Sequence, residues 1–232
     1  MKMGEIKGRT FDLLTLGQLL LRLSPPDNDR LSRGDTFVKQ VGGAELNVAV
    51  GASLLGLHTG VISKLPSHDI GSFMKGKIRS YGVSDDFFMY DDSPSARVGI
   101  YYYENGAYPR KPKVIYDRAN SSFYSLKIDE IPEKAYTASR CFHTSGITLA
   151  LSPKVRETTI EMIKRFKAAG TLVSFDVNFR GNLWTGEEAK ECIEQILPYV
   201  DIFFCSEDTA RLTFKKTGTA REMMKSFTEE YP

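Results

Sequence analysis

GGAELNVAVGASLLGLHTGVISKL, residues 42–65, changes its hydrophobic period once along its length. After the two glycines, apolar or small residues recur every three or four positions, which is typical of a helix that packs on one face. Residues 59–65 no longer follow this spacing and contain Val61, Ile62 and Leu65, which indicates a strand. The stretch therefore predicts a helix that runs into a strand, with the helix stripe formed by Leu46, Ala49, Val50, Ser53, Leu54 and Leu57.

The same alternation of strands and helices extends to both sides of this stretch. Residues 11–16 form a short apolar run before Gly17, which predicts an earlier buried strand. Asp69 is expected to cap the next helix, because its side chain can accept a hydrogen bond from a free N–H group at a helix start. Further strands are predicted at 141–144, 172–175 and 200–205, and further helices after Ser152-Pro153 and after the capping boxes that begin at Thr185 and Thr219.

Two segments depart from this rhythm. Residues 95–104 alternate between two kinds of side chain, and a second extended segment, residues 114–118, follows a turn region. A period of two predicts strands with two different faces, and we expect an antiparallel ribbon separate from the main sheet. The predicted fold is α/β, with a mostly parallel sheet, helices on both faces, and a small β excursion drawn from about 19–41 and 87–118 of one domain.

The composition excludes several classes of protein. Of the 232 residues, 41% are hydrophobic and 26% charged, which is typical of a folded globular protein. The 31 Lys and Arg residues nearly balance the 29 Asp and Glu, so the net charge of +2 provides no field for binding nucleic acid. Neither a signal peptide nor a membrane-length apolar segment is present, from which we expect a cytoplasmic protein without a membrane partner. Cys141, Cys192 and Cys205 are too widely spaced for a disulfide framework or zinc site and are expected to be small buried residues.

Polar residues follow several of the predicted strands. Because ligands of parallel sheets bind at the carboxyl ends of the strands, this pattern favours a pocket for a polar small molecule. Each residue taken alone can equally be a turn or cap residue. The residues concerned are Gly17-Gln18, Ser145-Gly146, Asp176, Asn178, Arg180 and Ser206-Glu207.

Two further features have two interpretations each. The helix start at Gly42-Gly43 offers free N–H groups and a positive dipole end to a hydroxyl-rich or carboxylate ligand, or it is a tight turn that needs glycine. Tyr101, Tyr103 and Arg97 share a face of the ribbon, where they either stack on a sugar and bind its carboxylate or pack across strands or subunits. His143 lies in a buried strand and is expected to be a core residue rather than a base.

A set of ordered motifs resembles the ribokinase-like (PfkB) carbohydrate kinases. The first signature of that family is matched by Gly42-Gly-Ala-Glu-Leu-Asn-Val-Ala49. Further motifs look like the 2-keto-3-deoxygluconate kinase branch: Leu20-Leu-Arg-Leu-Ser-Pro25, Gly99-Ile-Tyr101 with Glu104-Asn-Gly106, Val114-Ile-Tyr-Asp-Arg-Ala119, Phe142-His-Thr-Ser-Gly-Ile147 and Phe175-Asp-Val-Asn-Phe-Arg180 with Leu183-Trp184. Together these motifs cover nearly the whole chain in order.

The resemblance implies a ribokinase-like three-layer α/β/α fold with a β lid, and transfer of the ATP γ-phosphoryl group, with Mg²⁺, to the primary hydroxyl of 2-keto-3-deoxygluconate. It implies substrate contacts for one set of residues: Gly42, Gly43, Ala44, Glu45, Asn47, Tyr101, Tyr103 and Arg180. It implies nucleotide contacts for a second set: Asn178, Arg180, Ser206 and Glu207.

The chain departs from the family pattern at three places. Ser206 and Thr209 stand where the family usually has asparagine and an acidic residue that organises metal and phosphate. The Gly-Ala-Gly-Asp motif with the catalytic aspartate falls beyond Pro232 in the family, so we expect residues 1–232 to be an incomplete, inactive part of the kinase domain. Fructokinase or another sugar kinase, an inactive sugar-acid-binding protein, and a dimerisation module that pairs through the exposed lid edges remain as alternatives.

Overall fold

The computed structural model describes residues 8–231, and these residues form two compact units. The first unit contains the chain up to Leu16 and again from Lys127 onward, and the second unit contains Gly17–Leu126.

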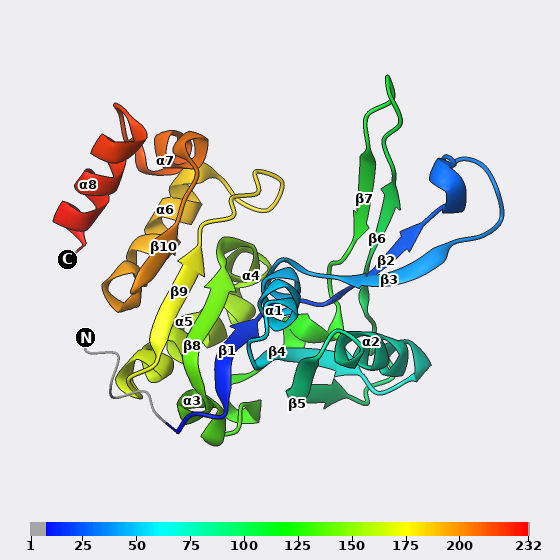
Figure 1. Cartoon of the computed structure of the whole chain (residues 1–232), viewed down its shortest axis with the longest axis horizontal. Helices are drawn as coiled ribbons and strands as arrows, with labels where there is room; N and C mark the ends of the chain where they lie inside the picture. Colours follow the sequence, from blue (N-terminus) through cyan, green and yellow to red (C-terminus); the bar gives the residue numbers. More distant parts are fainter. Residues whose placement is uncertain (1–7, 232) are drawn as a thin grey trace. The chain divides into compact units, whose positions relative to one another are not determined.

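The first unit is built on parallel strands (Figure 1). Their order is β10-β9-β8-β1, and each pairs in parallel with its neighbour. The strands are β1 Phe11–Leu16, β8 Ser139–Ser145, β9 Leu172–Asp176 and β10 Ile202–Phe204. The helices are α3 Lys134–Ala138, α4 Gly146–Ala150, α5 Pro153–Ala168, α6 Gly186–Glu194, α7 Glu207–Phe214 and α8 Ala220–Glu230, with 3-10 turns at Ile128–Glu130 and Leu197–Tyr199.

The predicted start signals of three helices in this unit are confirmed. Ser152 accepts a hydrogen bond from the N–H of Val155, 3.2 Å away, at the start of α5. Thr185 and Thr219 form the capping boxes of α6 and α8. The sequence did not predict α4 and α7, and β10 is shorter than the predicted 200–205 strand.

Aromatic side chains fill the core of the first unit. Phe142 and Phe166 are fully buried, and their rings stack with centroids 4.0 Å apart. Tyr136 meets Phe166 edge to face at 5.0 Å. This packing fixes α5 against β8, whose carboxyl end carries the polar residues of interest.

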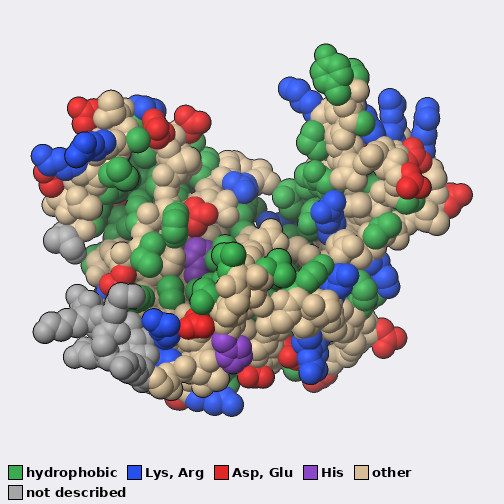
Figure 2. Space-filling view, in the orientation of Figure 1, with side chains coloured by type: hydrophobic (Ala, Val, Ile, Leu, Met, Phe, Trp, Pro, Cys, Tyr) green, Lys and Arg blue, Asp and Glu red, His purple; other side chains and the backbone are tan. Residues whose placement is uncertain are grey.

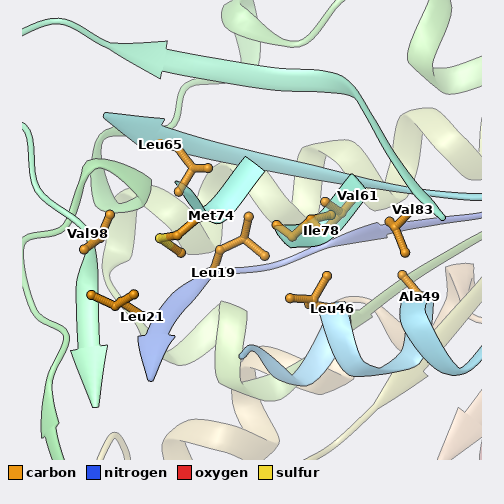
Figure 3. Packing of buried hydrophobic residues seen from close by; sticks show 10 residues of the cluster. All are labelled: Leu19, Leu21, Leu46, Ala49, Val61, Leu65, Met74, Ile78, Val83 and Val98. Carbon is orange, nitrogen blue, oxygen red and sulfur yellow. The ribbon is translucent and has the colours of Figure 1, made fainter. Parts of the chain in front are cut away.

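The second unit contains the predicted helix and strand of residues 42–65. They are α1 Ala44–Leu54 and β4 Thr59–Pro66, followed by α2 Asp69–Arg79 and β5 Val83–Asp91. β5 pairs in parallel with β4. Figure 3 shows the apolar cluster that joins these elements, formed by Leu19, Leu21, Leu46, Ala49, Val61, Leu65, Met74, Ile78, Val83 and Val98.

Two details of this unit correct the sequence predictions. His68, rather than Asp69, caps α2, because its ring nitrogen Nδ1 accepts from the N–H of Ile70 at 3.2 Å and Asp69 is the first helical residue. The excursion was expected to begin near residue 87, but residues 87–91 belong to β5, where Phe87 pairs with Ile62 of β4. The mixed polarity of β5 concealed it, since only Val83 and Phe87 are buried.

The predicted β excursion forms a four-stranded sheet, which we call the lid sheet. Its order is β3-β2-β6-β7, with β2 Leu20–Ser24, β3 Val38–Gly42, β6 Gly99–Glu104 and β7 Lys113–Asp117. β6 and β7 are antiparallel, as predicted. Short 3-10 turns lie at Pro26–Asn28 and Ser122–Ser125. Figure 2 shows hydrophobic and basic side chains together on the projecting β6–β7 ribbon.

Candidate functional site

The start of α1 depends on the glycine pair that precedes it. Gly43 has a φ of 153°, and a Cβ there would lie 2.8 Å from the carbonyl oxygen of Gln18. A glycine is therefore required, and the backbone enters α1 beside residue 18. The carbonyl of Gly43 accepts the N–H of Asn47 at 2.9 Å, whereas the N–H groups of the first turn, at Ala44 and Glu45, have no i−4 partner within the helix.

Gly42 lies directly under a lid tyrosine. A Cβ at Gly42 would lie 2.6 Å from the hydroxyl oxygen of Tyr101, so the absence of a side chain lets this hydroxyl approach the backbone just before α1. Tyr101 is half-buried, and its ring lies 5.9 Å from that of Tyr116 on the neighbouring strand. The sequence offered ligand contact and cross-strand packing as alternatives for Tyr101, and the structure shows the packing together with the approach to α1.

Glu45 is a deeply buried residue of the predicted site. It is 2% exposed, and its carboxylate lies so close to Gly17 that no Cβ could be placed there. The carbonyl of Gly17 in turn accepts the hydroxyl of Ser63 at 2.8 Å. Glu45 is thus fixed at the beginning of α1, whereas Asn47, two residues later, is exposed.

Arg22 connects the two predicted lid tyrosines. Its guanidinium carbon lies 4.3 Å from the ring centroid of Tyr103, and its positive charge also acts on the hydroxyl of Tyr101. Burial raises the pKa of Tyr101, and the nearby Arg22 opposes that rise, so the hydroxyl remains a neutral donor at neutral pH. Arg97, which the sequence grouped with these tyrosines, instead forms an ion pair with Asp117 at 2.8 Å.

A second arginine of the lid is held by a buried amide. Gln18 is 3% exposed, and its side-chain oxygen accepts from Nε of Arg118 at 2.8 Å. Its amide nitrogen donates to the carbonyl of Arg118 at 3.0 Å and to the hydroxyl of Ser121 at 2.7 Å. Arg118 lies 5.6 Å from the Tyr116 ring. Sequence analysis placed Gln18 after a strand and Arg118 on a strand face, but it missed their pairing because the two are far apart along the chain.

In the first unit, the predicted nucleotide residues follow β9 and β10. The carboxylate of Asp176, at the end of β9, accepts the N–H of Asn178 at 2.9 Å, and Asn178 adopts a φ of 35°. Arg180 is exposed, and its guanidinium donates to the carbonyl of Phe179 at 2.9 Å. The backbone at Val177, just before this turn, packs directly against Gly146, because any Cβ at residue 146 would collide with the carbonyl of Val177.

Ser206 and Glu207 are both exposed at the start of α7. The Ser206 hydroxyl caps the helix, because it accepts the N–H of Thr209 at 3.2 Å and lies 2.9 Å from the Thr209 hydroxyl. Glu207 forms an ion pair with Arg211 at 3.2 Å. Glu207 also borders an apolar pocket of about 470 Å³, whose other walls include Phe203, Phe204, Met223 and Phe227.

Two groups of reactive side chains are buried or half-buried. His143 is 5% exposed, lies 2.9 Å from the hydroxyl of Ser174, and has a pKa lowered by burial, which confirms a core role. Burial raises the pKa of the thiols of Cys141 and Cys192 to about 11 and that of Cys205 to about 12, so all three stay protonated at neutral pH. Cys192 is buried as predicted, but Cys141 and Cys205 are half-buried.

Two observations bear on the remaining predictions. Within residues 8–231, no cluster of three or more His, Cys, Asp or Glu side chains could hold a metal ion. In the same part of the chain, every helix is too short or too polar to cross a bilayer.

Comparison with known proteins identifies relatives with this fold. The family model described as "pfkB family carbohydrate kinase" matches residues 10–230. A 2-dehydro-3-deoxygalactonokinase of Haloferax volcanii is 38% identical over 211 residues, which are 91% of this chain and 65% of that protein. The chain thus spans somewhat less than two thirds of the length of this relative.

Two solved structures share the arrangement of strands and helices. The 2-dehydro-3-deoxygluconokinase of Thermotoga maritima is 34% identical, with a TM-score of 0.86 over 95% of this chain and 68% of that one. An uncharacterized sugar kinase of Pyrococcus horikoshii in complex with ATP is 26% identical, with a TM-score of 0.76 over 88% of this chain and 66% of that one. The expected ribokinase-like α/β fold with a small second sheet is therefore confirmed.

Proposed function

Because the chain belongs to the pfkB family of carbohydrate kinases, we propose that its protein transfers the γ-phosphoryl group of ATP to the primary hydroxyl of 2-keto-3-deoxygluconate. The observation that carries this proposal is the arrangement in the second unit, where the Tyr101 hydroxyl lies over Gly42 at the start of α1. The names of the Haloferax and Thermotoga relatives support a 2-keto-3-deoxy sugar acid as the substrate. The same proposal places the protein in the cytoplasm, where kinases find ATP.

The residues of the second unit would bind the sugar. The N–H groups of the first turn of α1, behind Gly42 and Gly43, would donate to hydroxyl groups. Tyr101 and Tyr103 would cover the sugar, since neutral phenol groups combine an apolar ring with a hydrogen-bonding tip. Arg118, whose Nε is fixed by Gln18, would add a positive charge to the surroundings of the sugar acid.

The residues of the first unit would bind the nucleotide. Arg180 is exposed and is held only through its own neighbouring carbonyl, so it can turn toward a phosphate. Asn178 and the start of α7 at Ser206-Glu207 would border the nucleotide. Mg²⁺ would be held mainly by the ATP phosphates and by water, since the described residues supply no protein cluster for it. When bound, it would neutralise charge on the transferred group.

A steady-state assay of ADP formation with a panel of sugars tests this proposal. The expected result is the highest kcat/KM for 2-keto-3-deoxygluconate, and a preference for fructose would replace the sugar-acid assignment with a neutral-sugar kinase. Arg180→Ala is expected to raise the KM for ATP or sugar acid on the order of 10-fold or more. Arg140→Ala is a matched control, because Arg140 is exposed in the same unit and pairs with Asp12 at 3.1 Å.

A second candidate is a sugar-acid-binding protein without kinase turnover. The observation that favours it is the hydrogen bond between the hydroxyl groups of Ser206 and Thr209. The family usually has an amide and a carboxylate at these two positions. Calorimetry that detects sugar binding, together with an assay that detects no ADP, would select this candidate. Turnover above the sugar-free background would exclude it.

We also propose that the protein forms a homo-oligomer through the lid sheet. All five residues of β7 are exposed, including Val114, Ile115 and Tyr116, and the alternation of the strand places apolar side chains on both of its faces. Ile115→Lys is expected to produce a monomer in light scattering. Leu55→Lys, which changes an exposed leucine at the end of α1, should leave the mass unchanged, and an unchanged mass for both variants would refute the lid interface.

A further inference from the structure

Arg22 occupies a defined place in the lid sheet. The parallel pairing of β2 and β6 sets Arg22 beside Tyr101. Its Nε donates to the hydroxyl of Ser24 at 2.9 Å, and its guanidinium lies 4.3 Å above the ring of Tyr103. The side chain is half-buried, so these contacts fix the plane of the guanidinium rather than leaving it free in solvent.

The charge of Arg22 is not neutralised by a carboxylate. The ion pairs among residues 8–231 include Arg97 and Arg110 of the lid sheet and its loops, but not Arg22. Its contacts are a hydroxyl group of Ser24, a hydroxyl group of Tyr101 and an aromatic ring, which stabilise a cation without cancelling its charge.

The surroundings of Arg22 leave room for such a partner. Arg22 borders a pocket of about 510 Å³ that Ser24, Asp27, Gln40 and Asn105 also line. Asp27 is exposed and takes part in none of the ion pairs of the described residues. The alternation of β3 and its pairing with β2 place Gln40, opposite Arg22, on the same face of the lid sheet as Gly42. Arg22 therefore faces the side of the sheet on which Tyr101 approaches the start of α1.

We propose that Arg22 is a specificity-determining residue that selects an acidic sugar over a neutral one by pairing its guanidinium with the sugar carboxylate. This inference rests on the proposed function and names a residue of that site which the sequence motifs did not assign. Two parallel N–H···O bonds suit a guanidinium whose Nε is already used and whose two terminal nitrogens lie side by side. A neutral sugar gains no such pair, and it leaves the fixed charge without a partner.

Calorimetric titration of the full chain with 2-keto-3-deoxygluconate and with fructose, a neutral ketose, tests the proposal. Arg22→Met keeps the length of the side chain and removes the charge, and Arg22→Lys keeps the charge without the fork. Arg79→Met is the matched control, since it removes one positive charge from α2 of the same unit, where Arg79 contacts Asp85 at 3.7 Å. Thermal unfolding of each variant confirms that it is folded.

Arg22→Met is expected to weaken binding of the sugar acid on the order of 10- to 100-fold and that of fructose less than about 3-fold. Arg22→Lys should lie between wild type and Arg22→Met, and Arg79→Met should match wild type. Equal effects of Arg22→Met on the two sugars, or none on either, would overturn the role of Arg22 while leaving the sugar-acid proposal intact. Failure of the wild-type chain to bind the sugar acid would overturn both.

Discussion

Replacing Gly42 by alanine probes the approach of Tyr101 to the start of α1. The new Cβ would lie 2.6 Å from the Tyr101 hydroxyl oxygen and 3.1 and 3.2 Å from two of its ring carbons. Cβ atoms do not occur closer than 3.0 Å to other heavy atoms, so the hydroxyl must move by at least roughly 0.4 Å. Because this atom is the far end of a side chain, the ring can pivot without moving the strand.

The cost should therefore appear in ligand binding rather than in folding. The displaced hydroxyl leaves its position over α1, and a hydrogen bond from it to the charged sugar acid would contribute about 1.5–3 kcal/mol. We expect sugar-acid binding to weaken roughly 10- to 100-fold. The free energy of unfolding should change by less than about 1 kcal/mol, since alanine also restricts the unfolded chain.

A double-mutant cycle with Tyr101→Phe separates this mechanism from a general disturbance of α1. Phenylalanine lacks the hydroxyl, which leaves only the tolerable contacts at 3.1 and 3.2 Å, so Gly42→Ala should cost at least about 1 kcal/mol less binding free energy in that background. Gly51→Ala, at an open position of α1, is the control and should not affect binding. Equal costs of Gly42→Ala in both backgrounds, measured by calorimetry, would refute the reasoning.

Three further predictions concern stability, each measured by urea unfolding. Gly71→Ala places a Cβ against the backbone carbonyl of Pro66 and should destabilise the protein by about 1–3 kcal/mol or more. Gly76→Ala, on the same helix α2, meets open space and should stabilise the protein by up to about 1 kcal/mol. Equal effects of the two substitutions would contradict the packing of α2. Phe166→Ala removes a fully buried ring that stacks on Phe142 and should cost about 3–5 kcal/mol, so a cost below about 1 kcal/mol would exclude it from the core. Burial lowers the pKa of His143 in the folded protein, so the unfolded chain binds this proton at a higher pH than the folded protein does. The free energy of unfolding should therefore fall as the pH drops below about 6.5. His143→Gln should reduce this dependence on pH, and an unchanged dependence would argue against the buried neutral ring.

The elements that sequence analysis predicted correctly carry their signals locally. Ser152 and the capping boxes at Thr185 and Thr219 lie within one turn of the helices they begin, so a few residues determine each boundary. The missed elements lack such signals. α4 has only five residues, and β5 has two buried side chains in nine residues, so pairing with β4 rather than its own periodicity makes it a strand.

The residues of the candidate site also differ in whether a local sequence signal identifies them. Gly42 and Tyr101 could be proposed from motifs because each is distinctive in its own segment. The roles of Arg22 and of the pair Gln18 and Arg118 depend on which strands become neighbours, since parallel pairing of β2 with β6 brings Arg22 to Tyr101 and a buried amide joins residue 18 to residue 118. A single sequence contains no local pattern that encodes such distant pairings.

The lid tyrosines show why packing and binding are not opposed interpretations. Tyr101 contacts Tyr116 across the strand pair, and that contact holds the Tyr101 ring where its hydroxyl overlies Gly42. Under the proposed function, a ligand would meet a hydroxyl whose position is already restricted by the protein, so little side-chain entropy would be lost on binding. Cross-strand packing would then assist ligand recognition, because it holds the Tyr101 hydroxyl of the lid sheet in a defined position.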